Sequence, residues 1–560
     1  MKEVEELLAI AGELPAEVEQ AVTRLLNAVE ALSSDKKALA DEVERLKKQL
    51  EKKKKTKTTD GANPDSKDEG KQSEKPDSDH SSEEQRKKRK KPGTKPASDR
   101  RTFKDLTVHQ TVECPVDPES LPPDAVRIDD ESVIIQDIEI QPKNTRFQLH
   151  VYYSAAEGKF YRGSLPNGYG NSDFAPDLRA LIVSLKYCGN MSEAKIREFL
   201  ENFDVQVSTG SVSNILTHTA ETFEQDYHDV LMAGLASTTY QQTDDTSARV
   251  AGQAWHTHIL CNPFYTVYST RPSKDRLAVL AVLQNTDELR FRFNEETRRL
   301  LRETLVIPAK WQESIAALGE DVVFDAKALK TLLDGWFGER NQQTRTAIEQ
   351  AAAIVYYRGQ TNVPVVQTLV CDDAGQFKLL TDRLALCWIH AGRHYERLNP
   401  VVPRHAELLN SFTERYWDYY ASLQDYRAGP SVELASHLRL EFDKLFSTRT
   451  GYVTLDERIA LTASKKEELL TVLTVPEVPL HNNASELGAR VSARRRDVSL
   501  HSRSVRGARS MDIFTTLVQT CKKVGVSAFE YLRDRLHGRS DSPSLAQYIQ
   551  AAAQTANASP

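Results

Sequence analysis

The sequence predicts an α/β protein in which a sheet follows a long helical leader. Three strand-like runs follow one another closely after residue 238, and a buried-type run lies near residue 366. Apolar side chains at an alternating three- and four-residue spacing fill the first fifty residues. A charged stretch with almost no apolar residues separates these two parts, and a chain of this length is expected to form three or four units.

Bulk composition limits the classes of protein that this chain fits. With 560 residues, 39% of them hydrophobic, it can build several cores. A net charge of −6 means that any contact with nucleic acid must come from local basic clusters. Neither a secretory signal nor an apolar run of about eighteen residues is present, so we expect a soluble, cytoplasmic protein without membrane contact. The six cysteines form no C-x-x-C pair, which argues against a disulfide framework or a zinc ribbon.

Residues 1–51 are expected to form a coiled-coil helix that joins copies of the chain into a homo-oligomer. The apolar seam is interrupted only by Lys36. A long amphipathic helix folded back on its own protein is the alternative. The seam comprises Val18, Val22, Leu25, Val29, Leu32, Leu39, Val43, Leu46 and Leu50.

Residues 52–101 have the composition of a disordered charged linker, because Ala62 is the one apolar residue between Lys52 and Lys95 apart from glycine and proline. Basic runs at 52–55 and 86–91 can contact DNA phosphates without sequence specificity, although a solvated charge run explains the first equally well.

A small β domain is expected at 102–165 and a helical region at 166–235. In the second, Ser192 is the expected N-cap of one short helix, and a turn at 207–210 leads into another. Two short helices joined in this way suit a helix-turn-helix that offers Thr209, Ser211 and Asn214 to a DNA groove, although any helical hairpin looks similar.

The third and largest region, residues 236–500, carries the chemistry. Strands at 238–245, 255–260 and 265–270, then a helix at 274–283, resemble the opening of a ribonuclease-H-like fold, in which an Asp on the first strand faces a metal site. Further strands are expected at 365–370 and 384–388, with helical insertions at about 285–363 and 400–475, and residues 501–560 are expected to form a helical C-terminal segment.

Three acidic side chains are the candidate metal ligands: Asp244, Asp372 at the carboxyl end of a strand, and Glu486 in a later helix. Convergent carboxylates hold two divalent ions that assist an in-line displacement at a phosphodiester. Alternatives remain for each position. Asp245 or Asp373 can replace its neighbour, Asp244 can begin a turn, and Glu486 can belong to a capping box that starts at Asn483.

Several blocks together resemble the insertion sequence 66 family of transposases over nearly the whole chain, in order. They are Thr243-Asp244-Asp245-Thr246 with Trp255, the run from Cys387 to Tyr395, Asn482-Asn483-x-x-Glu486-x-x-x-Arg490, and the tail from Asp512 through Leu532. The resemblance implies a DDE triad of Asp244, Asp372 and Glu486. It also implies two Mg²⁺ ions, for which Mn²⁺ can substitute, and accessory proteins encoded by the same element as candidate partners.

The chain departs from the family pattern at three positions. Cys114 has no second cysteine nearby, where family members carry a zinc-finger-like segment. His481 and Leu487 replace the usual acidic residue and the usual arginine beside the catalytic block.

Arginines close to Glu486 are candidate contacts to the DNA backbone, because guanidinium groups bind phosphate through paired hydrogen bonds. Arg393 belongs to a near-helical set that contacts phosphates or faces solvent. The complete set is Arg490, Arg494, Arg495, Arg496, Arg503, Arg506, Arg509 and Arg393.

We therefore expect a bacterial transposase that binds transposon ends, cleaves one strand and joins it to target DNA. A catalytically inactive DNA-binding descendant is the alternative, motivated by His481 and Leu487. No feature favours a structure-specific nuclease.

Overall fold

The computed structural model describes residues 15–56 and 107–558, apart from gaps at 118–119, 127–128, 130, 167, 170–171, 339 and 540. Most of the predicted linker, including the basic run at 86–91, lies outside the described residues. No helix in the described part is long and apolar enough to cross a membrane.

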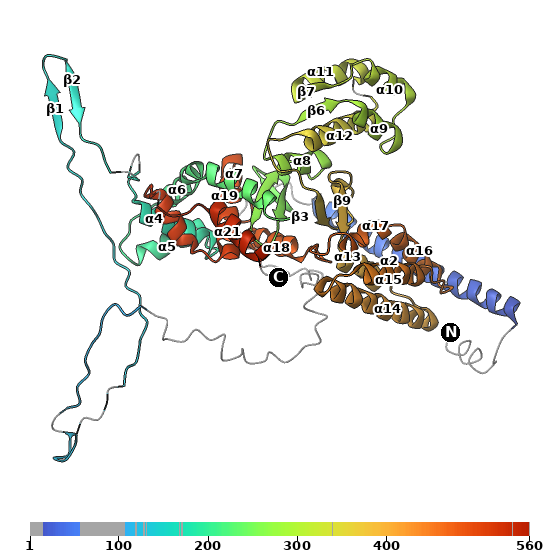
Figure 1. Ribbon diagram of the computed structural model, residues 1–560, viewed down its shortest axis with the longest axis horizontal. Coiled ribbons are helices and arrows are strands. Elements are labelled where there is room, and N and C mark those ends of the chain that lie inside the picture. Colours follow the sequence, from blue (N-terminus) through green and yellow to red (C-terminus); the bar gives the residue numbers. More distant parts are fainter. Residues whose placement is uncertain are drawn as a thin grey trace.

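A five-stranded mixed sheet lies at the centre of the molecule and confirms the α/β class (Figure 1). The strand order is β5-β4-β3-β8-β9. The first three strands run antiparallel as consecutive hairpins, whereas β8 and β9 run parallel to β3. Their bounds are β3 Tyr240–Val250, β4 Gln253–Cys261, β5 Thr266–Arg271, β8 Thr368–Cys371 and β9 Arg383–Leu386.

Side chains of one helix close the outer edge of this sheet. The edge strand β5 points the amides of Thr266, Tyr268 and Thr270 away from β4. These amides donate to Thr520 Oγ1, Thr516 Oγ1 and Asp512 Oδ2 of α19 (Val505–Val524) at 3.3, 3.0 and 2.7 Å. The three acceptors are spaced by four residues, so they lie on one face of α19. The edge therefore has no free amides at these positions to pair with another chain.

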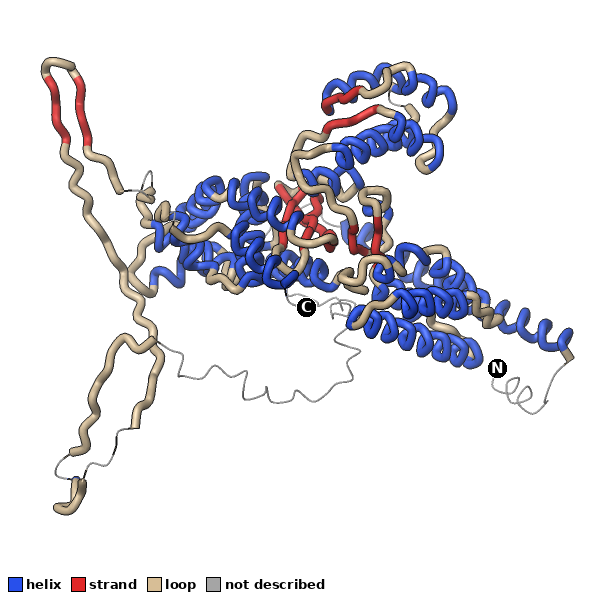
Figure 2. Tube along the Cα trace, in the orientation of Figure 1, coloured by secondary structure: helices blue, strands red, loops and turns tan. Residues whose placement is uncertain are grey.

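One insertion separates β5 from β8, and a second separates β9 from the helix that carries Glu486 (Figure 2). The first was expected to be helical at 285–363, but it also contains an antiparallel pair of strands, β6 Arg290–Phe293 and β7 Val322–Asp325. Phe291 and Phe293 alternate inward along β6, which is the two-residue periodicity of a strand. The helices of the insertions and those beside the sheet are α8 Arg276–Gln284, α9 Glu295–Glu303, α10 Ala309–Ala316, α11 Ala326–Phe337, α12 Gln342–Gly359, α13 Trp388–Glu396, α14 Pro403–Ala428, α15 Val432–Phe446, α16 Val453–Ala463 and α17 Lys466–Leu469.

The N-terminal helix α2 (Ala16–Thr56) extends past the predicted boundary at residue 51 and packs partly on its own chain. Leu26 is buried, and Glu30 accepts hydrogen bonds from the amides of Val401 and Val402 at 2.7 and 3.0 Å. The alternative of a helix folded back on its own protein is thus confirmed in part, and association between copies stays a prediction. One face of α2 packs on α14, while another face leaves a seven-residue repeat exposed: Val18, Leu25, Leu32, Leu39 and Leu46.

The expected β domain at 102–165 is absent from its described part. Residues 107–150 are almost entirely extended chain, and only a short hairpin follows, formed by β1 Val151–Ser154 and β2 Lys159–Arg162. Apolar side chains are present, such as Val133 and Ile135, but they are exposed. No core forms in this segment because no second layer covers them.

Helices complete the part of the chain beyond the hairpin and beyond the sheet. Ser192 caps its helix as predicted, by accepting from the Lys195 amide. The elements are α4 Pro176–Tyr187, α5 Glu193–Glu201, α6 Thr209–Thr222, α7 Glu224–Ala236, α18 Asn483–Ser499, α20 Ala528–Leu536 and α21 Leu545–Ala558.

Candidate active site

Asp244 and Asp245 lie in the middle of β3, which continues to Val250. This position removes the interpretation that they begin a turn. Successive side chains on a strand point to opposite faces, so the two carboxylates face different surroundings. Asp245 accepts a hydrogen bond from Gln376 Nε2 at 3.0 Å and lies 3.9 Å from Lys274 Nζ. Asp245 therefore has partners of its own on its side of the sheet.

Asp372 and Asp373 follow the carboxyl end of β8, beside β3 in the sheet. Asp373 forms ion pairs with Lys465 and with Lys378, the latter at 3.2 Å. Burial acts to raise the pKa of Asp373, but hydrogen bonds from these lysines outweigh it and the pKa lies below its ordinary value. Asp372 has no such cation. Its Oδ1 accepts from the Ala374 amide at 3.1 Å, which orders the turn after the strand.

Close packing against the sheet holds α18 and places Glu486 in the first turn of this helix. Ser485 Oγ donates to the carbonyl of Thr243 at 3.2 Å, beside Asp244. Gly488 meets β4 so closely that an added Cβ would lie 2.8 Å from Ile259 Cγ2. Helix α18 begins at Asn483 with Asn482 as N-cap, and Asn482 makes no side-chain capping bond. The capping-box interpretation of Asn483 and Glu486 therefore fails.

Electrostatics connect the three predicted carboxylates. Burial, and then the negative charges of Asp372 and Glu486, raise the pKa of Asp244 to about 7. Burial also raises the pKa of Asp372, while the neighbouring His390 acts to lower it. The negative charges of Asp245 and Asp373 also act to raise the pKa of Asp372, so acidic side chains concentrate negative charge here, which a divalent cation would relieve. Their oxygens are hard ligands of the kind that Mg²⁺ prefers, so the residues fit the implied ion.

Glu486 nevertheless turns toward α13. Its Oε1 lies 3.7 Å from His390 Nε2, and its Oε2 lies 3.7 Å from Arg393 Nη2. Among the described residues, the group of possible ligand atoms that all lie within 4.8 Å of one another is Cys387, His390 and Glu486, not the three carboxylates. The arginine and the histidine thus hold Glu486 on the side of α13, and a metal ion shared with the two aspartates would have to compete with them for this carboxylate.

Two side chains of the site were not predicted to take part. Asn482 is buried, and neither of its side-chain polar atoms has a hydrogen-bond partner within the described residues. Cys387, immediately before α13, is also buried, and burial raises the pKa of its thiol to about 12. Both positions stand in the sequence blocks that carry the family resemblance, and that was the only signal that pointed to them.

Two of the arginines predicted to contact DNA, Arg495 and Arg509, make contacts inside the protein. Arg495 is buried, donates to the carbonyl of Tyr187 at 3.0 Å and stacks on the Tyr187 ring at 4.9 Å. Arg509 pairs with Glu224 at 2.5 Å and lies 4.1 Å from the Tyr227 ring centroid. Burial therefore removes Arg495 from contact with DNA and corrects that prediction, whereas Arg509 is partly exposed and its contact with DNA stays a prediction.

The remaining predicted arginines are accessible to different degrees. Arg494 and Arg503 are exposed, and Arg490 is half-buried. Arg496 donates to the carbonyl of Ser247, whereas Arg506 is exposed but pairs with Glu221 at 2.6 Å. Exposed guanidinium groups therefore remain close to Glu486 along α18.

The predicted helix-turn-helix corresponds to α5 and α6, which contact each other. Ser208 caps α6 by accepting from the Ser211 amide at 2.9 Å. Thr209 and Asn214 are exposed at the start of α6, while Ser211 is half-buried and its hydroxyl bonds Ser208. Thr209 and Asn214 thus have the exposure that groove contacts require, and Ser211 has less of it.

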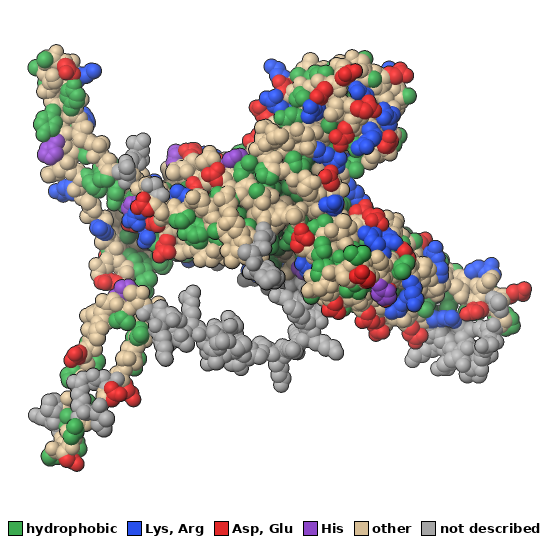
Figure 3. Space-filling model, viewed as in Figure 1, with side chains coloured by type: hydrophobic (Ala, Val, Ile, Leu, Met, Phe, Trp, Pro, Cys, Tyr) green, Lys and Arg blue, Asp and Glu red, His purple; other side chains and the backbone are tan. Residues whose placement is uncertain are grey.

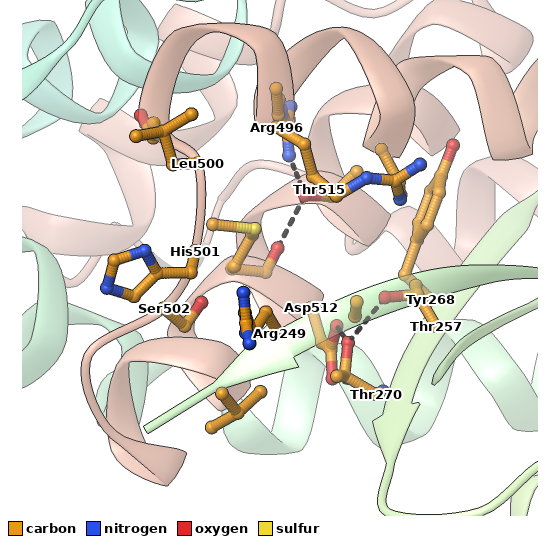
Figure 4. Close-up of a pocket in the computed structure, with 16 residues that line it drawn as sticks. Arg249, Thr257, Tyr268, Thr270, Arg496, Leu500, His501, Ser502, Asp512 and Thr515 are labelled. Carbon is orange, nitrogen blue, oxygen red and sulfur yellow. Dashed lines mark hydrogen bonds between the residues drawn. The ribbon is translucent and has the colours of Figure 1, made fainter. Parts of the chain in front are cut away.

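A small cavity lies between the sheet and the loop that joins α18 to α19 (Figure 4). In this view, the Thr270 hydroxyl donates a hydrogen bond to Asp512. The same hydroxyl shares a second hydrogen bond with the hydroxyl of Thr257 on the neighbouring strand. Burial raises the pKa of Asp512 to about 6. Arg249 and His501 border the cavity on the side of the loop.

Comparisons with known proteins indicate the family of the chain. A model of the Transposase IS66 family matches residues 340–510, a range that contains Asp372 and Glu486. The uncharacterized protein y4jO of Sinorhizobium fredii is 32% identical over 329 residues, which cover 55% of this chain and 94% of that protein. No solved structure matches the chain.

Proposed function

Because the chain belongs to the IS66 family of transposases, we propose that it is a DDE transposase with Asp244, Asp372 and Glu486 as its triad. The single observation that carries this proposal is the packing of the elements that bear the three side chains: β8 pairs with β3, and Ser485 of α18 bonds the carbonyl of Thr243 at 3.2 Å, next to Asp244. The sheet supports a ribonuclease-H-like core, since three antiparallel strands are followed by two strands parallel to the first.

Together, the three carboxylates would hold two Mg²⁺ ions. Bound ions supply Lewis-acid activation of the attacking hydroxyl and stabilisation of the leaving oxygen. The chain's own residues position these oxygens. β3 carries Asp244, the turn after β8 carries Asp372, and the packing of Gly488 on Ile259 holds α18 and hence Glu486. Asp373 stays with Lys465 and does not add a fourth free charge.

DNA would lie along the exposed guanidinium groups of α18 and the loop after it. Arg494 and Arg503 are exposed there and close in sequence to Glu486. Arginine binds phosphate through paired donors, so these side chains can orient a backbone against the triad. Thr209 and Asn214 of α6 would contact a groove at a second place.

Two copies of the chain would associate through α2. The exposed repeat from Val18 to Leu46 has the seven-residue period of a coiled-coil seam. Replacement of Leu32, which is 70% exposed, by Glu should leave the fold intact and shift the protein toward monomer in sedimentation velocity. If Leu32→Glu sediments as the parent does, α2 is not the association surface.

The test of catalysis is Mg²⁺-dependent nicking of a supercoiled plasmid that carries the element's own ends. We expect the parent protein to nick and Asp244→Asn to lose this activity. Asp245→Asn is the matched control, because it changes the adjacent residue on the same strand and should retain nicking. Equal activity of the parent and Asp244→Asn would refute the triad. Binding of the ends without nicking by the parent would favour the inactive descendant.

A further inference from the structure

The hairpin β1–β2 exposes both of its faces. The register pairs Val151 with Arg162 and Tyr153 with Phe160, so these side chains share one face. Tyr152 and Tyr161 lie on the other. Tyr152 is 68% exposed and Phe160 is 66% exposed. A two-stranded hairpin is at best marginally stable in water, so this element requires a partner that covers it.

The base of the hairpin is attached to the helical body, whereas its tip is remote from it (Figure 1). The ring of Phe147 meets Tyr169 edge-on at 5.1 Å, and Tyr169 lies 6.5 Å from the ring of His537. Beyond the strands, the Gly163 amide donates to the carbonyl of His150 at 2.9 Å and extends the pairing toward the base. The hairpin is therefore presented away from the body rather than folded onto it.

Charge indicates the chemistry of the partner. Residues 143–163, which we call the basic arm, carry four cationic side chains and one anionic side chain, although the whole chain has a net charge of −6. The cations are Lys143, Arg146, Lys159 and Arg162, and the anion is Glu157. Glu157 is occupied by a hydrogen bond from Tyr161. In the space-filling view, the arm stands clear of the body with its apolar and basic side chains uncovered (Figure 3).

A polyanion matches this arm better than a second copy of the chain does. A second copy would have to cover aromatic rings on both faces and also neutralise the cations. The major groove of duplex DNA is about 12 Å wide and accepts a two-stranded β-ribbon, whose exposed side chains can then contact base edges. Cations at the strand ends then contact the phosphates on either side.

We propose that the basic arm is a DNA-binding ribbon that enters the major groove, with Lys159 and Arg162 on the phosphate backbone. The proposal rests on the proposed function, since it takes DNA as the substrate. It adds a contact element that is distinct from α6 and from the arginines of α18. The exposed rings of Tyr152 and Phe160 become covered when the arm is bound.

The test measures how the affinity for DNA depends on salt. The full-length protein is titrated onto a fluorescein-labelled, mixed-sequence duplex at several salt concentrations, and binding is followed by fluorescence anisotropy. Each lost phosphate contact lowers the slope of log K against log salt by about 0.9. We expect the double variant Lys159→Gln, Arg162→Gln to reduce the slope by about 1.8. The matched control is Lys327→Gln, Lys330→Gln on α11, which removes two equally exposed charges and should leave the slope unchanged.

A second variant separates the ring contribution from the charge. Tyr152→Ala should weaken binding several-fold at every salt concentration without changing the slope, because no ionic contact is lost. An unchanged slope in the Lys159, Arg162 double variant would overturn the proposal. If that variant instead alters the sedimentation coefficient without DNA, the arm binds another copy of the chain. Nicking by the parent is scored separately, so loss of catalysis and loss of arm binding are distinguishable.

Discussion

The central strand β3 and the hairpin β1–β2 both form strands but have opposite surroundings. β3 is paired on both sides and covered by α18, whereas both faces of the hairpin are exposed. One strand neighbour, β4, follows β3 directly, whereas β8 and the covering helix α18 come from more than a hundred residues later in the chain. The comparison shows that strand propensity selects the backbone conformation, while distant segments decide whether a strand belongs to a core or waits for a partner.

The largest expected effect contrasts two adjacent aspartates at the end of β8. Asp372→Asn should reduce Mg²⁺-dependent nicking by about a thousandfold, equivalent to about 4 kcal/mol of barrier, because a metal ligand is lost. Asp373→Asn should change it by only a few-fold, since Asp373 pairs with Lys465 and Lys378. Initial nicking rates measure both variants. A larger loss in Asp373→Asn than in Asp372→Asn would mean that Asp373, not Asp372, is the metal ligand.

The next effect tests the difference between sheet and hairpin directly. Ile259→Ala should lower the free energy of unfolding by about 2 to 5 kcal/mol, because Ile259 is fully buried beneath Gly488. Tyr153→Ala should lower it by less than about 0.5 kcal/mol, as expected for an exposed position. Urea denaturation followed by circular dichroism measures both. A comparable loss in Tyr153→Ala would mean that the hairpin is covered in the isolated protein.

The third effect concerns Asp512, the side chain of α19 that accepts a hydrogen bond from the edge strand β5. Burial raises the pKa of Asp512 from 3.8 to about 6. The folded state therefore holds this proton more tightly than the unfolded state does. The resulting stabilisation is complete below pH 3.8 and is lost as the pH rises through about 6. Relative to Asp512→Asn, the parent should lose about 3 kcal/mol of unfolding free energy across this window, measured by urea denaturation. If the difference in unfolding free energy between the two proteins did not change with pH, the pKa of Asp512 would not be raised in the folded state.

The smallest effect concerns the competition for Glu486. Arg393→Gln should increase the affinity for Mg²⁺ by about three- to fivefold, since a half-exposed ion pair contributes up to about 1 kcal/mol. The melting temperature without DNA, recorded at increasing Mg²⁺ concentration, reports this affinity. Arg397→Gln, on an exposed position just after α13, is the control and should match the parent. If both variants behave alike, the pairing of Arg393 with Glu486 does not limit ion binding.

Local patterns were sufficient to predict the strands of the sheet. They also selected the acidic residues on these strands as candidate ligands. The strands near 238, 255, 265, 365 and 384 all exist, because their apolar content and turn residues are local properties. Local pattern alone left the choice between Asp372 and Asp373 open, and only the family resemblance favoured Asp372. The choice depends on Lys465, which lies 92 residues later and reaches the site only through the fold.

Failed predictions share a dependence on distant contacts. Arg495 was expected to be accessible because it stands in an arginine run, but Tyr187 covers it from 308 residues away. The apolar runs near 133 and 147 predicted a β domain, and most of that chain forms no strand because nothing packs on it. Periodicity describes one element at a time, and burial is a property of pairs of elements.

The hydrogen bonds from Val401 and Val402 to Glu30 have a consequence for synthesis on the ribosome. Glu30 is translated 371 residues before its first partner. At about 5 to 20 residues per second, α2 leaves the ribosome roughly 20 to 70 s before its docking site on α14 exists. During that interval the leucine repeat of α2 can meet the same helix on a neighbouring nascent chain. Pairing between chains made on one messenger can therefore precede the completion of either core.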